Sequence, residues 1–334
     1  SLARQNGWGG GFFGVGGLGW VLGLLLGGVR WRFMSLRYDT ISFLSDYGHA
    51  DEFVGVVHSV IRQIAPAVTV IDITHEIAPY DVRAGGLALG RAAQYLAPGV
   101  VIAVVDPSVG STRRAIAVEV GDGQSVLLGP DNGLLAPAVA MVGGATRAVW
   151  LNNSDYHLEG AGSLFDGRDI FASVAAHLCN GVALEDLGEL IEPAGLIPGT
   201  LPISELTETE LTAEVLWIDH YGNAQLNADP EELDGLGTVF ELSLDSAGIL
   251  GGASPTVRTV KRVKSFSELT AGAIGLVIDS YGAIALVCDR TSAAEELGLG
   301  TGDALSLKPL DSADEPARAV TTPVQLSPSF RPQS

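Results

Sequence analysis

Six short polar strings stand out from an otherwise apolar chain, and they hold most of the residues that could do chemistry. They are Ser45-Asp46-Tyr47-Gly48, Asp72-Ile73-Thr74-His75, Asp106-Pro107-Ser108-Val109-Gly110, Pro130-Asp131-Asn132-Gly133, Phe165-Asp166-Gly167-Arg168-Asp169 and Asp219-His220-Tyr221-Gly222-Asn223. An aspartate accepts hydrogen bonds from hydroxyl groups or water and can serve as a general base. Each string alone also fits a turn, a helix cap or an ion pair, so only the whole set can indicate a function.

Several common catalytic motifs are absent from the sequence. It contains neither G-x-x-x-x-G-K-[ST] nor G-x-S-x-G, which excludes a P-loop and a hydrolase elbow. His75-Glu76 lacks the second histidine of a zinc helix, and the two cysteines, Cys179 and Cys288, are too far apart for a zinc motif. Glycines 14, 16 and 19 match G-x-G-x-x-G, but no strand precedes them. We therefore expect no metal and no dinucleotide.

The elements that position these strings alternate between strands and helices. Apolar and β-branched runs predict strands at 40–45, 68–74 and 100–105 and a hairpin at 115–120 and 125–128, and helical spacing predicts helices at 51–64, 81–96, 133–141 and 169–179. This order is typical of an α/β domain with a largely parallel sheet covered on both faces. Asp46 and Asp106 follow strands directly, where such sheets bind ligands.

A second domain is expected beyond a proline-rich linker. We place the α/β catalytic domain at residues 34–200 and a smaller β-rich domain at 207–310, with strands at 211–218, 223–227, 238–243, 273–279 and 283–288. Residues 1–33 are interpreted as an extension before a start at Met34, although the apolar run 12–29 is barely long enough to span a membrane. Residues 311–334 are predicted to be a disordered tail.

Composition narrows the class of protein. Hydrophobic residues make up 47% of the chain, which is enough for a sizeable core. The formal net charge of −20 repels phosphate backbones, so we expect no nucleic-acid partner. We also expect a cytoplasmic protein without a membrane partner.

Taken in order, the strings resemble one family, the S-adenosyl-L-methionine (SAM) hydroxide adenosyltransferases, relatives of the fluorinase and chlorinase enzymes. The resemblance runs from about Thr40 to about Leu310. It implies an α/β N-terminal domain, a β-barrel-like C-terminal domain and a homotrimer with active sites between subunits. It also implies an enzyme that hydrolyses SAM to adenosine and L-methionine without a cofactor.

The resemblance assigns substrate contacts at matching positions. Asp46 matches the aspartate that holds the ribose hydroxyls, and Asp51 an acidic residue near the methionine end. Tyr80 matches an aromatic residue that packs on the nucleoside. The remaining matches contact the amino acid part, the adenine or the methionine carboxylate, and they are Asp219, Asn223, Ser280 and Arg290.

The residues that position the attacking water match the family only in part. Asp106 and Arg113 match two members of its Asp-Arg-His set with the family's spacing of seven. Asp166 stands where the family string, Phe-His-Gly-Arg-Asp, often has histidine. We expect Arg113 to hold Asp106 ionised and one of the two aspartates, with a raised pKa, to act as base.

Four alternatives remain open from the sequence. A SAM halogenase is disfavoured because Asp106 and Asp166 would repel a halide ion, and because the chain has only a short turn near Val120 where fluorinase has a long insert. A non-catalytic SAM- or adenosine-binding protein would bind without turnover. A metal-dependent phosphohydrolase would use Asp46, Asp106 and Asp131 at strand ends. A membrane-anchored interaction protein would depend on residues 12–29.

Overall fold

The apolar runs of the first domain form a seven-stranded sheet. The computed structural model describes residues 36–160, 162–244 and 256–310. The strand order is β2 (Thr69–Thr74), β1 (Thr40–Ser45), β3 (Val100–Val104), β5 (Ser125–Pro130), β4 (Ala115–Val120), β6 (Ala145–Trp150) and β7 (Glu189–Ile191). The first four are parallel, and β4, β6 and β7 continue the sheet in antiparallel pairs. The predicted α/β fold is confirmed.

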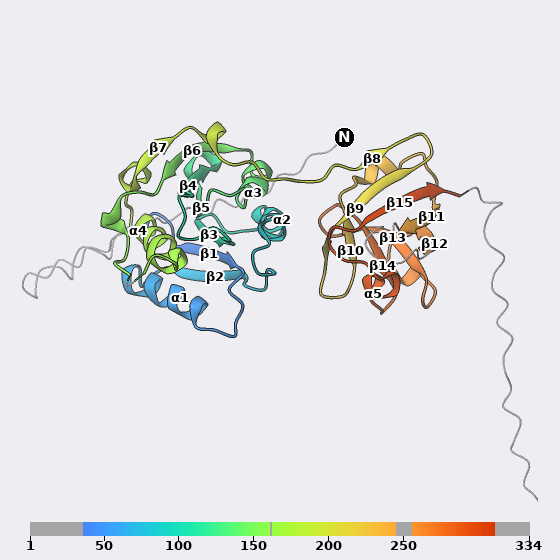
Figure 1. The fold of residues 1–334 in the computed structure, drawn as a ribbon, viewed down its shortest axis with the longest axis horizontal. Helices are drawn as coiled ribbons and strands as arrows, with labels where there is room; N and C mark the ends of the chain where they lie inside the picture. The colour runs from blue at the N-terminus through green and yellow to red at the C-terminus, as the bar shows by residue number, and fades with distance from the viewer. Residues whose placement is uncertain (1–35, 161, 245–255, 311–334) are drawn as a thin grey trace, which may run out of the picture.

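Helices cover both faces of this sheet. Helices α1 (Phe53–Ile64) and α4 (Ser173–Cys179) pack on one face, and α2 (Val82–Ala93) and α3 (Ala136–Met141) on the other (Figure 1). Because successive side chains of a strand point to opposite faces, Phe43 belongs to the core under α1 and Leu44 to the core under α2. Burial on both sides explains why these strands are apolar without interruption.

Helix α4 begins with an irregular turn. Residues Gly167–Ala172 form a π-helical turn that leads directly into α4, so the helix predicted at 169–179 starts two residues earlier than expected. π turns in helices are rare and are often found at functional sites. This one begins directly after Asp166.

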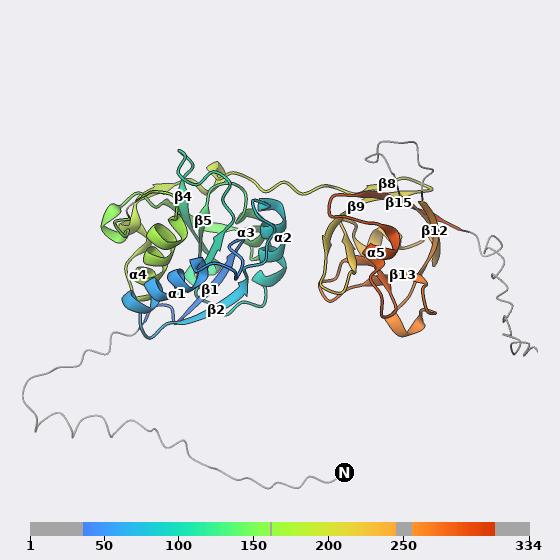
Figure 2. The ribbon, with the colours of Figure 1, turned by 60° about the horizontal axis from the view of Figure 1, so that its bottom comes forward.

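The second domain is a closed barrel. Its strands pair in the order β10 (Ala224–Leu226), β14 (Ile284–Cys288), β13 (Ile274–Ile278), β12 (Thr256–Arg262), β11 (Val239–Leu244), β15 (Ala304–Pro309) and β9 (Leu211–Ile218), and β9 pairs back to β10. The short β8 (Glu205–Leu206) pairs with the start of β9, at Leu211 and Thr212 (Figure 2). Phe240, Leu242 and Leu286 fill the interior, and α5 (Ala293–Leu297) packs against β14. The predicted barrel-like domain is confirmed.

The two domains touch through α2 and β9. Arg83 of α2 forms a salt bridge with Glu214 of β9 at 2.5 Å. The guanidinium of Arg91 lies 3.9 Å from the ring centroid of Trp217, and burial lowers the pKa of this arginine. These contacts join an arginine face of the first domain to the barrel wall.

Two predictions from the sequence fall outside the described residues, namely the extension at 1–33 and the tail at 311–334. Within the described ranges, every helix is too short or too polar to cross a membrane.

Candidate functional site

The first domain contains a cavity at the carboxyl ends of β1 and β3. It measures about 250 Å³, and carboxylates and aromatic rings share its wall. It is lined by Asp46, Tyr47, Phe53, Pro79, Tyr80, Val104, Asp106, Val109, Leu164, Phe165, Asp166 and Gly167. Asp46 follows β1 and Asp106 lies just beyond β3, so strand ends deliver both carboxylates to one place. We call this cavity the carboxylate pocket.

Arg113 joins two of these carboxylates. Its Nε donates to Oδ2 of Asp106 at 2.7 Å, and its Nη2 pairs with both Asp106 and Asp166. The side chains of Arg113, Asp106 and Asp166 are 9%, 4% and 15% exposed, so this cluster is largely shielded from water. A shared guanidinium offsets the repulsion between two buried negative charges.

The two aspartates have different surroundings. Oδ1 of Asp106 accepts hydrogen bonds from the backbone N–H and the hydroxyl of Ser108, both at 3.2 Å, which fixes its orientation. Within the described part of the chain, no hydrogen bond occupies Oδ1 of Asp166. Burial raises the pKa of Asp166, with a smaller upward contribution from Asp106 and an opposing one from Arg113. The open oxygen and the raised pKa suit Asp166 to accept a proton.

The pocket rim is shaped by tyrosines. Tyr80 has a left-handed backbone (φ 69°), and its amide donates to Oδ2 of Asp46 at 2.9 Å. Its side chain is 71% exposed and so is free to cover a ligand. Tyr47 is half-buried, burial of its phenol raises the pKa of that group, and its ring contacts Phe53 and Phe165. A Cβ on Gly167 would lie 2.2 Å from the Tyr47 hydroxyl, so any larger residue there would force the Tyr47 ring to move.

A second cavity lies in the barrel and is built by two turns of like sequence. Asp219-His220-Tyr221-Gly222 and Asp279-Ser280-Tyr281-Gly282 each bend at a glycine with φ 81°. In each turn Oδ1 of the aspartate accepts the amide of the tyrosine at 2.8 Å. The cavity measures about 260 Å³, and Trp217, Asp219, Asn223, Phe266, Ser280 and Tyr281 contribute to its wall. We call it the barrel pocket.

The structure thus groups most of the residues singled out from the sequence into two separate sets. Asp46, Tyr80, Asp106 and Asp166 line the carboxylate pocket, whereas Asp219, Asn223 and Ser280 line the barrel pocket. Each of these two cavities is lined by residues of one domain only.

Two predicted substrate contacts lie outside both cavities. Asp51 is exposed at the bend before α1, and Arg290 has a 90% exposed side chain on a left-handed backbone (φ 59°). Asp219 lines the barrel pocket, but both of its oxygens already accept hydrogen bonds from its own turn, including one from Nδ2 of Asn223 at 2.8 Å. In this structure its role is to shape the turn.

Comparisons with known proteins identify the family of this chain. Residues 41–188 match the N-terminal domain of the SAM hydroxide adenosyltransferases, and residues 213–306 match their C-terminal domain. The chain belongs to the SAM hydroxide adenosyltransferase family. It is 42% identical to an (R)-S-adenosyl-L-methionine hydrolase of Salinispora tropica, an alignment that covers 79% of this chain and 96% of that protein.

Two further relatives complete the comparison. A fluorinase of Actinopolyspora mzabensis is 27% identical, with 61% of this chain and 78% of that enzyme covered. A crystal structure of an uncharacterised conserved protein from Thermotoga maritima has a TM-score of 0.72 at 27% identity, covering 80% of this chain and 99% of that one. Among these relatives, the hydrolase is the more similar in sequence.

In this family member the structure adds residues that the sequence analysis did not single out. Phe53, Pro79 and Phe165 line the carboxylate pocket, and Trp217, Phe266 and Tyr281 line the barrel pocket. Tyr47 and Phe165 were visible within the polar strings, but their aromatic character alone did not distinguish a ligand contact from core packing. The repeated Asp-x-Tyr-Gly sequence was a usable signal for Tyr281.

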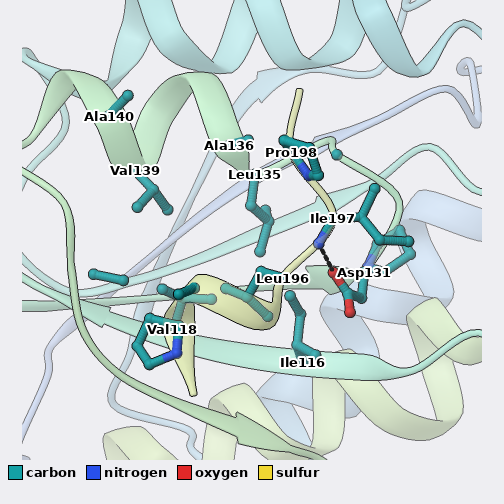
Figure 3. Close-up of a pocket in the computed structure, with 15 residues that line it drawn as sticks. Ile116, Val118, Asp131, Leu135, Ala136, Val139, Ala140, Leu196, Ile197 and Pro198 are labelled. Carbon is teal, nitrogen blue, oxygen red and sulfur yellow. Dashed lines mark hydrogen bonds between the residues drawn. The ribbon is translucent and has the colours of Figure 1, made fainter. Parts of the chain in front are cut away.

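Asp131 lines a third cavity, whereas the strand-end aspartates Asp46 and Asp106 line the carboxylate pocket. The third cavity measures about 390 Å³, lies between α3, β4 and the segment 193–198, and is mainly apolar (Figure 3). Oδ1 of Asp131 accepts the amide of Ile197 at 2.9 Å, and Oδ2 pairs with Arg114. Asp131 therefore does not converge with Asp46 and Asp106, contrary to the phosphohydrolase alternative.

Removing the guanidinium of Arg113 tests whether it offsets the repulsion between Asp106 and Asp166. In Arg113→Ala, two carboxylates stay buried without a partner, so we expect a loss of about 3–5 kcal/mol in the free energy of unfolding at neutral pH. Burial already raises the pKa of Asp166, and loss of the cation raises it further. Protonation then relieves the repulsion, so the deficit should shrink as the pH falls. Urea denaturation at several pH values measures this.

The matched control is Arg262→Ala. Arg262 pairs at 3.0 Å with Asp234, which is 67% exposed, so its removal should change stability by less than about 1 kcal/mol at every pH. An Arg113→Ala deficit that is equally small, or that grows as the pH falls, would contradict this role of Arg113.

Proposed function

We propose that this chain hydrolyses SAM to adenosine and L-methionine. The observation that supports this best is the pair of buried carboxylates, Asp106 and Asp166, held by Arg113 beside a nucleoside-sized cavity. The hydrolase names of its relatives, at 42% and 34% identity over most of the chain, support the same reaction.

The reaction has one demanding step, which is the attack of water on C5′ of the substrate. The sulfonium is already a good leaving group, so the C5′–S bond breaks with its electron pair left on sulfur and no general acid is needed. Oδ1 of Asp166 is free to take the proton of the water, whose oxygen becomes the 5′-hydroxyl of adenosine. Asp106 acts on the base: Ser108 and Arg113 fix its carboxylate, and this holds Arg113 in place against Asp166.

The rest of the carboxylate pocket would hold the nucleoside. Asp46 accepts the ribose hydroxyls, and the exposed ring of Tyr80 covers the sugar or base. Rings of Tyr47, Phe53 and Phe165 keep water away from the reacting carbon. A dry pocket favours the reaction, because hydroxide and sulfonium neutralise each other's charge in the transition state.

Water is a better nucleophile than a halide ion in this site. Two carboxylates at the point of attack repel an anion but accept hydrogen bonds from water. The alternative of a non-catalytic binding protein is less favoured, because Asp166 retains a free, raised-pKa oxygen where a base is needed. The proposed chemistry uses no cofactor, and a cytoplasmic location stays a prediction.

A complete site needs both pockets, and we infer that they meet between subunits of a homotrimer. The carboxylate pocket supplies contacts for the nucleoside and the barrel pocket supplies contacts for the remaining part of SAM. Each pocket is lined by one domain, which supports an arrangement in which a neighbouring subunit provides the barrel half.

Incubation with SAM tests the reaction directly. Purified protein beginning at Met34, in chelator and without halide, should release adenosine and methionine in equal amounts, measured by chromatography. Binding of SAM without either product would identify a binding protein. Products that form only with added halide, or that vanish with chelator, would contradict metal-independent attack by water.

The pH dependence of the rate tests the assigned base. Because the base must be ionised, the rate should fall as the pH drops through the pKa of Asp166, which burial holds above its ordinary value of 3.8. Asp166→Asn should lower kcat by about 10²–10⁴-fold and abolish this acidic limb. An Asp166→Asn variant with the parent's rate and pH profile would exclude Asp166 as the base.

Mixing variants tests the inter-subunit site. Asp106→Asn disables the carboxylate pocket, and Ser280→Trp fills the barrel pocket with a large ring. If neighbouring subunits supply the two halves, co-refolding these two inactive variants should restore activity, because some interfaces then combine two intact halves. Co-refolding Asp106→Asn with Asp166→Asn, which damage the same half, is the matched control and should restore nothing. Equal activity in both mixtures would refute a shared site.

A further inference from the structure

Three side chains that the proposed reaction does not use meet beside β2. Asp72 lies on β2, His75 follows the end of that strand, and His58 comes from α1. Nε2 of His58 is 2.8 Å and Nε2 of His75 is 3.1 Å from the same Oδ1 of Asp72. In the described part of the chain, this is the one group of three histidine, cysteine, aspartate or glutamate residues whose ligand atoms all lie within 4.8 Å of one another.

The spacing of these atoms suits a tetrahedral metal ion. Ligand atoms about 2.0 Å from Zn²⁺ are about 3.3 Å from one another in a tetrahedral arrangement. The two short distances here fall a few tenths of an ångström below that value, so small side-chain rotations would admit an ion. Two imidazoles and one carboxylate are also a ligand set that divalent transition metals favour.

The buried histidine is already oriented by a second partner. Nδ1 of His75 lies 2.7 Å from the hydroxyl oxygen of Ser45, and that oxygen also accepts the amide of Tyr47 at 3.3 Å. If Nδ1–H donates to Ser45, the lone pair of Nε2 faces Asp72. Metal-binding histidines are commonly held this way, with the second ring nitrogen donating to a neighbour. Nε2 is buried and, among the residues that the structure describes, makes no well-aligned hydrogen bond, despite its closeness to Asp72.

We propose that His58, Asp72 and His75 bind one divalent transition-metal ion, for which Zn²⁺ is the best match. The site is open on one side, since the side chains of His58 and Asp72 are 34% and 38% exposed whereas that of His75 is fully buried. An ion can therefore enter from solvent and complete its coordination with water. The carboxylate of Asp72 supplies a negative charge that would attract the cation.

This site is separate from the chemistry proposed for the carboxylate pocket, so either proposal can fail alone. It does touch the same segment of chain. Besides the contact with Ser45, the carbonyl of His75 accepts the amide of Gly48 at 2.8 Å. The ion would therefore brace the turn that carries Asp46 and take no part in the attack of water.

Cobalt binding measures the site directly. Full-length protein, freed of any affinity tag and treated with chelator, is titrated with Co²⁺ while the visible d–d absorption is followed, and Zn²⁺ is then added. We expect one Co²⁺ per chain, an absorption typical of a four-coordinate ion, and its displacement by Zn²⁺. His58→Ala removes one of three protein ligands and should weaken Zn²⁺ binding by at least about 100-fold.

Two further variants make the outcome decisive. Asp72→Asn should also weaken binding, whereas His220→Ala, which removes an exposed histidine of the barrel, should bind as the parent does. Zn²⁺ should raise the melting temperature of the parent and of His220→Ala but not that of His58→Ala. Absence of stoichiometric Co²⁺ binding by the parent, or equal binding by the His58→Ala and His220→Ala variants, would overturn the proposal.

Discussion

The candidate site depends on one constraint, which is that two carboxylates are buried side by side. Burial and the repulsion between the two negative charges both oppose this arrangement. A single guanidinium meets both, and its planar fork of N–H donors allows it to do so from one side. The elements around it serve this arrangement: β3 ends just before Asp106, the hairpin strand β4 begins beyond Arg113, and the π turn before α4 presents Asp166.

The division of labour between the two domains follows from their architecture. Parallel strands gather loops at one sheet edge, which suits a pocket with several charged groups. A closed barrel has no such edge, and here its pocket is built from two hairpin turns instead. Both turns have the same hydrogen-bonding pattern because an aspartate holds the backbone and a glycine permits the bend. The small domain thus offers a pocket wall that combines aromatic, aliphatic and polar side chains.

Much of this could be predicted from the sequence, but not all of it. The apolar runs predicted β1, β3 and the hairpin of β4 and β5, and strand ends correctly brought Asp46 and Asp106 together. Strands β6 and β12 were missed, because Ala145–Trp150 and Thr256–Arg262 mix charged residues with apolar ones. The pairing of Arg113 with Asp166 spans 53 residues, so no local pattern predicts it, and family resemblance only placed Asp166 in the same set as Arg113. The left-handed backbone of Tyr80 could not be predicted, because tyrosine, unlike glycine, does not indicate that conformation.

The charge of the carboxylate pocket has a consequence for turnover. Three aspartates and one arginine give the pocket a formal charge of −2 when all are ionised, three negative charges against one positive. Such a field attracts a sulfonium, which is a cation at the reacting centre. After hydrolysis that centre holds a neutral thioether and a neutral alcohol, and the attraction is gone. The site would release its products for the same electrostatic reason that it binds its substrate, without a separate step of opening.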